Sequence, residues 1–238
     1  MKRVWCMLVC LLAALLLSVA AAAEDGTAAM TLMVYLCGSD LETTRGAASA
    51  DLAEMIAACP DGDNLQVVVM ASGAAAWHSD IAPDTAAIYA LDGEGLQLVS
   101  RGVSGSMGDP ATLGALLACG YEQFPARRYA LLLWDHGAGP MLGVCFDERY
   151  TDDDGMDGLT LGEIGQALAA SPFAREKLEW IGFDACLMAS LETACMAAPY
   201  ARYMIASQEA EPSSGWNYAF LTELVQDASG ADTGRRAA

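Results

Sequence analysis

The chain has little positive charge and almost no histidine. Its 238 residues include 12 Lys and Arg against 31 Asp and Glu, which gives a formal net charge of −19, and only two histidines. A surface this acidic repels nucleic acid and anionic lipid, so we expect neither as a partner. Basic peptides and cations are the ligands that the charge favours, although a soluble exported protein can carry such a charge without binding either.

Fingerprints of nucleotide binding are also absent. The chain contains no Walker A sequence, and no G-x-G-x-x-G follows an apolar strand. The run D-G-E-G at 92–95 lies between two short apolar segments, 86–91 and 96–101, and predicts a β-hairpin. The sequence therefore gives no support to a nucleotide-binding enzyme.

Closely spaced cysteine pairs are missing, although the chain has eight cysteines. Cys6 and Cys10 lie in the apolar N-terminal segment, and the other six show no C-x-x-C spacing. A chain of this length does not need a disulfide scaffold, and a zinc site is disfavoured because neither paired thiols nor several histidines are present. We expect most of the six to be small buried hydrophobic residues.

The N-terminal segment predicts export. Lys2 and Arg3 precede an apolar run that ends in the small residues Ala21 to Ala23, the pattern of a cleavable signal peptide over residues 1–23. The run approaches the length of a membrane-spanning helix, so an uncleaved N-terminal anchor is the alternative. We expect a secreted or extracytoplasmic protein that, after signal removal, does not insert stably in the membrane.

Buried strands alternate with helix patterns along the rest of the chain. Near-continuous apolar runs at 31–37, 65–71, 127–134, 178–183 and 203–207 are typical of parallel strands that are covered on both faces. Helices are expected after Ser39 or Asp40 as N-cap, from Asp109-Pro110 to Tyr121, and after Thr160, where Glu163 completes a capping box. This alternation predicts a single α/β domain with a mostly parallel sheet.

A cysteine stands where one of these strands ends. The strand that begins at Leu178 stops at Asp184, and Cys186 follows before a helix-compatible segment, L-M-A-S-L-E-T-A-C-M. A helix N-terminus carries unpaired N–H groups and a partial positive charge, which favour a thiolate over a thiol. Cys186 is therefore the best-placed candidate nucleophile.

A thiol nucleophile needs a base, and only His78 and His136 are available. His136 follows the strand at 127–134 and precedes Gly137, whereas His78 lies in a polar loop and is interpreted as a surface residue. Side chains that follow parallel strands meet at one edge of the sheet. The 50 residues between His136 and Cys186 allow the crossover that two parallel strands require.

These segments resemble the clostripain-like (C11) cysteine peptidases of the caspase-like clan. The resemblance is carried by Y-L-C-G-S-D-L-E at 35–42, L-L-W-D-H-G-A-G at 132–139 and G-F-D-A-C-L-M-A at 182–189, and it extends from about Met30 to Tyr218. It implies a caspase-like, mostly parallel sheet flanked by helices, within a peptidase domain at 24–226. Chains of this family usually continue further, so residues 227–238 are interpreted as a disordered or truncated tail.

The resemblance also implies a mechanism. Cys186 would attack a scissile carbonyl and form a thioester, His136 would transfer protons, and the backbone N–H groups of Gly137 and Cys186 would hold the oxyanion. No cofactor is required for this chemistry. Asp184 would lie at the base of the P1 pocket and select Arg or Lys, unless it merely caps the following helix. Ser207, Gln208 and Glu209 would border the substrate cleft.

The acidic stretch from Met141 to Leu161 is interpreted as a linker. Calcium is kept as an optional ligand of its carboxylates, although the order of an EF-hand loop is missing. Arg149 is a candidate site of self-cleavage, because similar loops in the family are processed after a basic residue. A monomeric protein that acts on peptides with a basic P1 residue is expected. The alternatives are a catalytically inert binding module and a thiol hydrolase of small molecules.

Overall fold

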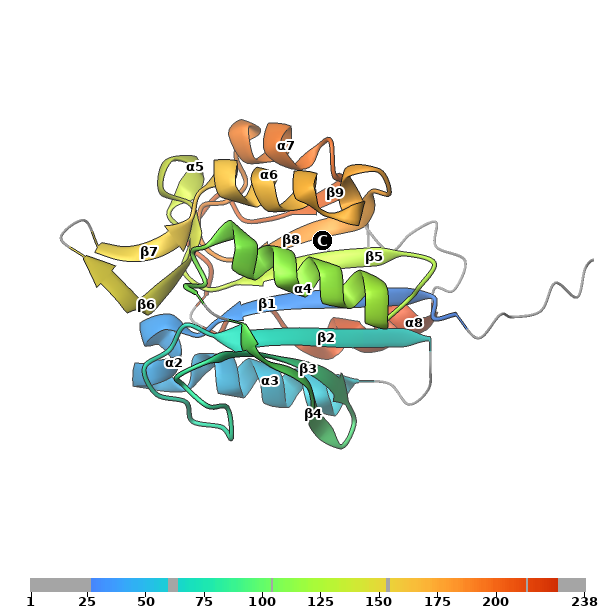
Figure 1. Cartoon of the computed structure of the whole chain (residues 1–238), viewed down its shortest axis with the longest axis horizontal. Coiled ribbons are helices and arrows are strands. Elements are labelled where there is room, and N and C mark those ends of the chain that lie inside the picture. The colour runs from blue at the N-terminus through green and yellow to red at the C-terminus, as the bar shows by residue number, and fades with distance from the viewer. Residues whose placement is uncertain (1–26, 60–63, 104, 153–154, 213, 227–238) are drawn as a thin grey trace, which may run out of the picture.

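A computed structural model describes residues 27–59, 64–103, 105–152, 155–212 and 214–226. Its main sheet has seven strands in the order β4-β3-β2-β1-β5-β8-β9 (Figure 1). The strands are β1 (Met30–Cys37), β2 (Leu65–Ser72), β3 (Ala86–Asp92), β4 (Gly95–Val103), β5 (Tyr129–Trp134), β8 (Leu178–Asp184) and β9 (Ala201–Ile205). The five strands from β2 to β9 are mutually parallel, and β3 and β4 form the expected hairpin at one edge. The expected mostly parallel α/β sheet is confirmed.

The central strands are buried because apolar side chains cover both faces of the sheet. Every residue of β1, β5 and β8 is buried, which explains why these segments are near-continuous apolar runs in the sequence. Alternate side chains enter opposite cores: Met33 and Tyr35 belong to one cluster, and Leu32 and Val34 to the other. The sheet thus separates two hydrophobic cores.

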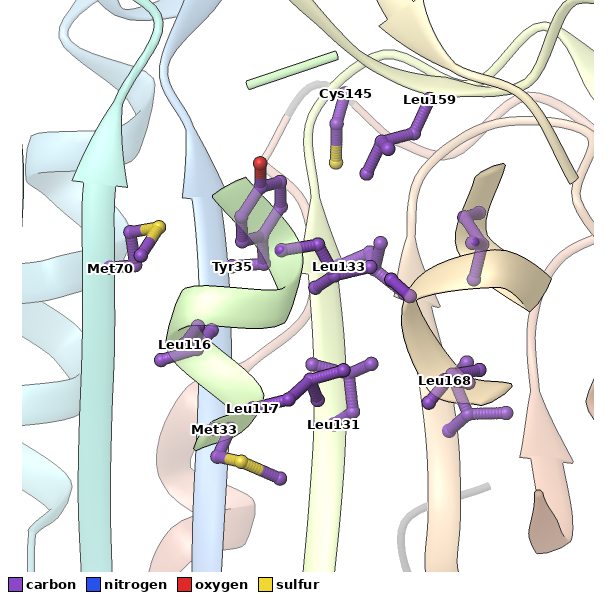
Figure 2. Close-up of a cluster of buried hydrophobic side chains, with 14 of the residues drawn as sticks. Met33, Tyr35, Met70, Leu116, Leu117, Leu131, Leu133, Cys145, Leu159 and Leu168 are labelled. Atoms are coloured by element: carbon purple, nitrogen blue, oxygen red, sulfur yellow. The ribbon is translucent and has the colours of Figure 1, made fainter. Parts of the chain in front are cut away.

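Helices cover both faces (Figure 1). The first face carries α4 (Pro110–Gln123), α6 (Leu161–Ala170), the turn η1 (Pro172–Ala174) and α7 (Leu191–Ala197). Figure 2 shows Leu116 and Leu117 of α4 beside Met33, Tyr35 and Leu131 of the sheet. The second face carries α3 (Ala47–Ala58), the turn η2 (Tyr218–Phe220) and α8 (Leu221–Gln226), and α2 (Ser39–Arg45) precedes α3. The arrangement is a three-layer α/β/α domain.

Two predicted helix starts are confirmed in atomic detail. The Asp109 side chain accepts a hydrogen bond from the N–H of Ala111 at the start of α4. Thr160 and Glu163 form the reciprocal capping box of α6. Each cap satisfies N–H groups that a helix terminus leaves without a partner.

Three local expectations are wrong. The stretch interpreted as a linker contains the short helix α5 (Gly139–Leu142) and a hairpin of β6 (Val144–Asp152) and β7 (Gly155–Leu159) in a second sheet. The helix that was expected directly after Cys186 begins only at Leu191, where Ser190 caps it. Gly38, without a side-chain bond, occupies the N-cap position of α2 that was expected for Ser39 or Asp40.

The six cysteines within the described residues are all free thiols. Cys37, Cys119 and Cys145 are buried as expected, whereas Cys195 is exposed and Cys59 and Cys186 are half-buried. The expected signal peptide at 1–23 and the tail at 227–238 lie outside the described residues. Among the helices that the structure describes, none is long and apolar enough to cross a membrane.

Candidate active site

A cavity of about 210 Å³ opens where β5 and β8 end. His136 and Cys186 both line it, and so does Asp184. Trp134 and Asp184 are register partners on the two adjacent parallel strands, so the residues that follow them emerge side by side. The sheet thereby brings together the three side chains that the sequence pattern placed at strand ends.

Gly137 lies directly against the backbone of Cys186. A Cβ atom at Gly137 would approach the Cys186 carbonyl oxygen to 2.1 Å and the Cys186 nitrogen to 3.0 Å. Atoms that are not bonded to each other cannot come this close, so only glycine fits here. This contact fixes how near the His136 turn and the Cys186 turn lie to each other.

The backbone N–H groups of Gly137 and Cys186 have no acceptor among the hydrogen bonds of the described residues. Gly137 pairs with Val144 as an isolated antiparallel bridge, and the two bonds of that bridge belong to its neighbours, Ala138 and His136. In this type of pair the N–H of the central residue points away from the partner strand. Both groups are therefore free to bond a ligand; Cys186 lines the cavity, and the half-buried Gly137 lies against it.

The sulfur of Cys186 receives a hydrogen bond from a backbone amide. The N–H of Glu211 donates to Sγ at 3.2 Å. Because α7 begins at Leu191, the helix N-terminus expected to favour the thiolate is not adjacent to Cys186. The Glu211 amide is the observed donor that can stabilise negative charge on this sulfur.

His136 is paired with a carboxylate that sequence analysis did not select. The His136 Nε2 atom lies 2.9 Å from Oδ1 of Asp40, and the two side chains are 41% and 47% exposed. Asp40 follows β1, the strand adjacent to β5, and this topology is the signal that could have placed it in the site. With Nε2 engaged, Nδ1 is the ring nitrogen left to exchange a proton.

The turn that carries His136 is held by a buried carboxyl group. Asp135 accepts a hydrogen bond from the Ser39 hydroxyl at 2.5 Å and another from the Phe146 N–H. Burial raises the pKa of Asp135 to about 7. These bonds join the residue after β5 to the residues that follow β1 and to the start of β6. They hold the backbone that leads into His136.

Asp184 forms part of the cavity floor. It is 4% exposed, and its Oδ2 accepts hydrogen bonds from the Tyr218 hydroxyl at 2.7 Å and the Trp216 N–H at 3.1 Å. Burial raises its pKa to about 6. Because Ser190 caps the next helix, Asp184 does not have the capping role that was its alternative interpretation.

Asp51 is a second acidic floor residue, which sequence analysis missed. It projects from α3 and is 5% exposed, and its Oδ2 accepts a hydrogen bond of 2.7 Å from the Trp134 indole. Burial, with a smaller contribution from the charge of Asp184, raises its pKa to about 7. A single aspartate within a helix pattern has no sequence signal that points to a pocket.

The three candidate cleft residues after β9 lie on a segment that runs beside the chain following Cys186. The carbonyls of Ser207 and Glu209 accept hydrogen bonds from the N–H groups of Ala189 and Leu187, respectively. Gln208 lies between them and, like both, is absent from the cavity lining. Two residues that sequence analysis did not select, Glu211 and Pro212, line the cavity from this segment.

Arg149 lies outside the cavity, in β6. Its guanidinium pairs with the buried Asp147 at 2.7 Å and donates to the carbonyl of Pro83 at 2.9 Å. Self-cleavage after Arg149 stays a prediction. Because Arg149 lies within β6, that part of the strand would have to leave the β6–β7 hairpin before cleavage. His78 is also outside the cavity, with its ring 3.4 Å from the Thr43 carbonyl.

The candidate calcium ligands fall partly outside the described residues, since 153–154 of the acidic stretch are not among them. Within the described part of the chain, no group of three or more His, Cys, Asp or Glu side chains is arranged to hold a metal ion. Calcium binding therefore stays a prediction from composition.

The fold is caspase-like, and the end of its parallel strands carries a Cys and His pair beside an acidic pocket. The chain belongs to the clostripain family (peptidase C11), whose model matches residues 34–237. It is 24% identical over 231 residues to clostripain from Hathewaya histolytica, an alignment that covers 84% of this chain and 43% of that protein.

Solved C11 structures share the fold. A secreted C11 cysteine protease from Bacteroides thetaiotaomicron, in complex with an irreversible peptide inhibitor, superposes with a TM-score of 0.63 at 20% identity, covering 82% of this chain and 53% of that one. An inactive zymogen of a C11 protease from Parabacteroides distasonis gives a TM-score of 0.62 at 19% identity, covering 87% and 57%. The chain thus spans about half the length of the relatives it matches.

Proposed function

We propose that the protein is a cysteine endopeptidase that cleaves after Arg or Lys, with Cys186 as nucleophile and His136 as proton carrier. The observation that carries the proposal is one cavity that contains a thiol, an imidazole and a buried carboxylate at its floor. Membership of the clostripain family supports the reaction class.

Acylation uses the groups at the mouth of the cavity. Cys186 transfers its proton to Nδ1 of His136, and the resulting thiolate attacks the carbonyl carbon of the scissile amide. The carbonyl oxygen becomes an oxyanion, which the free N–H groups of Gly137 and Cys186 stabilise. When this intermediate collapses, the C–N bond breaks, the leaving amine takes the proton from His136, and a thioester remains on Cys186.

Deacylation repeats the steps with water. His136 removes a proton from a water molecule as its oxygen attacks the thioester carbonyl, and the second oxyanion uses the same two N–H donors. Collapse breaks the C–S bond and releases the peptide acid. The proton held by His136 returns to the sulfur, so the enzyme is restored without a cofactor.

Charge at the cavity floor underlies the preference for a basic P1 residue. Asp184 is buried, and within the described residues no Lys, Arg or His side chain forms an ion pair with it. A basic substrate side chain would supply the missing cation and favour the ionised carboxylate. Peptides and proteins with a basic P1 residue are therefore the proposed substrates.

Export is part of the proposal. The charged and apolar pattern of residues 1–23 supports secretion, and the similar protease of Bacteroides thetaiotaomicron is described as secreted. An uncleaved N-terminal anchor is the alternative to signal cleavage. The protein is proposed to be a monomer.

The test is hydrolysis of matched fluorogenic peptide amides with Arg, Lys or Asp at P1, under reducing conditions and with calcium or a chelator. The chain is expected to cleave the Arg and Lys amides, and Cys186→Ala is expected to cleave neither. Preference for Asp would overturn the pocket assignment. No turnover by a folded chain would favour the binding module, and turnover of small thioesters alone would favour the thiol hydrolase.

Processing after Arg149 is proposed as a separate event. Intact-mass analysis of the active protein should find a fragment that begins at Tyr150, and this fragment should be missing from Cys186→Ala. A fully active chain that stays uncut at this position would exclude the proposed processing.

A further inference from the structure

Two carboxylates from different elements of the fold line the cavity. Asp51 comes from α3 and Asp184 from the end of β8. A Cβ atom at Gly215 would lie 3.0 Å from Oδ2 of Asp51 and 3.1 Å from Oδ2 of Asp184. Two acidic side chains thus border the same small volume, next to a residue without a side chain.

Each carboxylate keeps one oxygen without a partner. Trp134 donates to Oδ2 of Asp51, and Tyr218 and Trp216 donate to Oδ2 of Asp184. Among the hydrogen bonds of the described residues, neither Oδ1 atom has a donor. Each carboxylate therefore keeps an acceptor that a ligand in the cavity could use.

No cation of the protein neutralises this pair within the described residues. The ion pairs there are those of His136, Arg149 and Arg202, none of which involves Asp51 or Asp184. The exposed Arg45 lines the same cavity but forms no ion pair with either. Burying two acids together is unfavourable unless a cation joins them, and burial accordingly raises the pKa of both.

We propose that Asp51 is a specificity-determining residue, which together with Asp184 receives a forked, planar cation and makes the pocket prefer P1 Arg over P1 Lys. The inference rests on the proposed function, because it takes the cavity as the P1 pocket. A guanidinium presents five N–H donors in a fixed plane and can donate to both carboxylates at once. An ammonium carries three donors on one compact nitrogen and has no fixed plane, so Lys would match two carboxylates less well than Arg does.

Binding is tested without chemistry in the Cys186→Ala protein. Three labelled peptides differ only at P1, with Arg, Lys or citrulline, the neutral analogue of Arg, and fluorescence anisotropy at pH 8 gives their dissociation constants. The Arg peptide should bind most tightly. Adding Asp51→Asn should weaken the Arg peptide roughly 10- to 100-fold, the Lys peptide several-fold less than that, and the citrulline peptide least, because the loss is that of charge-assisted bonds.

The substitution is chosen to preserve the fold. The amide side chain introduced by Asp51→Asn keeps an oxygen that can accept the Trp134 indole N–H, and thermal unfolding monitors folding of each variant. Glu122→Gln is the control, since Glu122 is an exposed acid of α4, on the other face of the sheet, and lies outside the cavity. It removes the same charge and should leave all three dissociation constants unchanged.

A parallel measurement of kcat/KM in the protein that retains Cys186 separates the two proposals. If the chain cleaves Arg amides and Asp51→Asn lowers the Arg-to-Lys ratio of kcat/KM, both stand. If the ratio and the Arg affinity do not change, the role of Asp51 is wrong while the peptidase stands. If the Arg peptide binds through Asp51 but no amide is cleaved, the peptidase fails while the cation pocket stands. Equal loss of affinity for all three peptides would also overturn the role of Asp51.

Discussion

Oδ1 of Asp40 lies 2.9 Å from Nε2 of His136, so the imidazole is held from the side of β1. Both side chains are more than a third exposed, and a polar contact so exposed contributes little to stability. Its value is orientation of the ring, which leaves Nδ1 for proton transfer. Asp40 is thus a positioning residue for His136 in the proposed mechanism.

Replacing Asp40 should therefore affect kcat more than KM. We expect Asp40→Ala to lower kcat roughly 10- to 100-fold, because misplaced catalytic groups lose about that much rate, with the free energy of unfolding nearly unchanged. Asp40→Asn keeps an oxygen that can accept from the ring and should recover much of the rate. Steady-state kinetics on an Arg amide gives kcat and KM for both variants. A rise in KM at constant kcat would show that Asp40 acts on substrate binding instead.

Gly137 tests how closely the His136 and Cys186 turns must approach. In Gly137→Ala the new Cβ atom would collide with the Cys186 backbone, so we expect roughly a 100-fold or greater loss of kcat. Gly114→Ala is the control. Gly114 lies within α4, and a Cβ atom added there would meet no other atom within 4 Å. It should leave kcat unchanged and stabilise the helix by roughly 0.5–1 kcal/mol. Similar activity of both variants would contradict the close approach.

Asp51 should make the stability of the protein depend on pH. Its pKa is about 7 in the folded state against an ordinary value of 3.8, so the folded protein holds this proton more tightly than the unfolded chain. The free energy of unfolding then falls as pH rises between these values, by up to about 1.4 kcal/mol per pH unit from this group. Asp51→Asn removes this contribution.

Urea unfolding of wild type and Asp51→Asn between pH 5 and pH 8 measures the contribution of Asp51 to the free energy of unfolding. The variant should gain stability relative to wild type as pH rises, and the difference should level off above pH 7. Glu122→Gln, which removes an exposed acid on the other face of the sheet, should run parallel to wild type. Parallel curves for Asp51→Asn as well would mean that its pKa is not raised.

The pair of Arg149 with Asp147 should contribute strongly to stability. Asp147 is fully buried, and Arg149→Ala would leave its carboxylate without a cation, at a cost of roughly 3 kcal/mol. Adding Asp147→Asn should recover only part of that loss, since it removes the buried charge but can accept only one of the two backbone N–H groups that Asp147 binds. Arg175→Ala is the surface control, expected within roughly 0.5 kcal/mol of wild type in urea unfolding. Equal effects of the two arginine substitutions would refute the structural importance of the pair.

Strand positions were predictable because the central sheet is covered on both faces. The runs that end at Trp134 and Asp184 are apolar without interruption, and parallel strands bring their following residues to one edge. His136 and Cys186 could therefore be placed together from the amino-acid sequence alone. The caps at Asp109 and Thr160 were predictable because each joins residues that are two or three positions apart in the sequence.

Contacts between distant elements were not predictable. Asp51 resembles any polar residue of a helix, and only the position of α3 on the second face of the sheet brings it to Trp134. Asp40 was interpreted as a cap because local hydrogen bonding is the commoner role of an aspartate before a helix. The β6–β7 hairpin was taken for a linker because its strands are acidic and glycine-containing, a composition that is typical of loops.

The central claim is that Cys186 is a nucleophile served by an acidic P1 pocket. The most direct test is labelling with a peptide chloromethyl ketone that carries Arg at P1, followed by mass mapping of the cysteine-containing peptides. We predict one adduct, on Cys186, and much slower labelling in Asp184→Asn. Iodoacetamide, which has no P1 group, should instead label the exposed Cys195 as well. Labelling of Cys195 by the ketone in preference to Cys186, or equal rates in Asp184→Asn, would contradict the account.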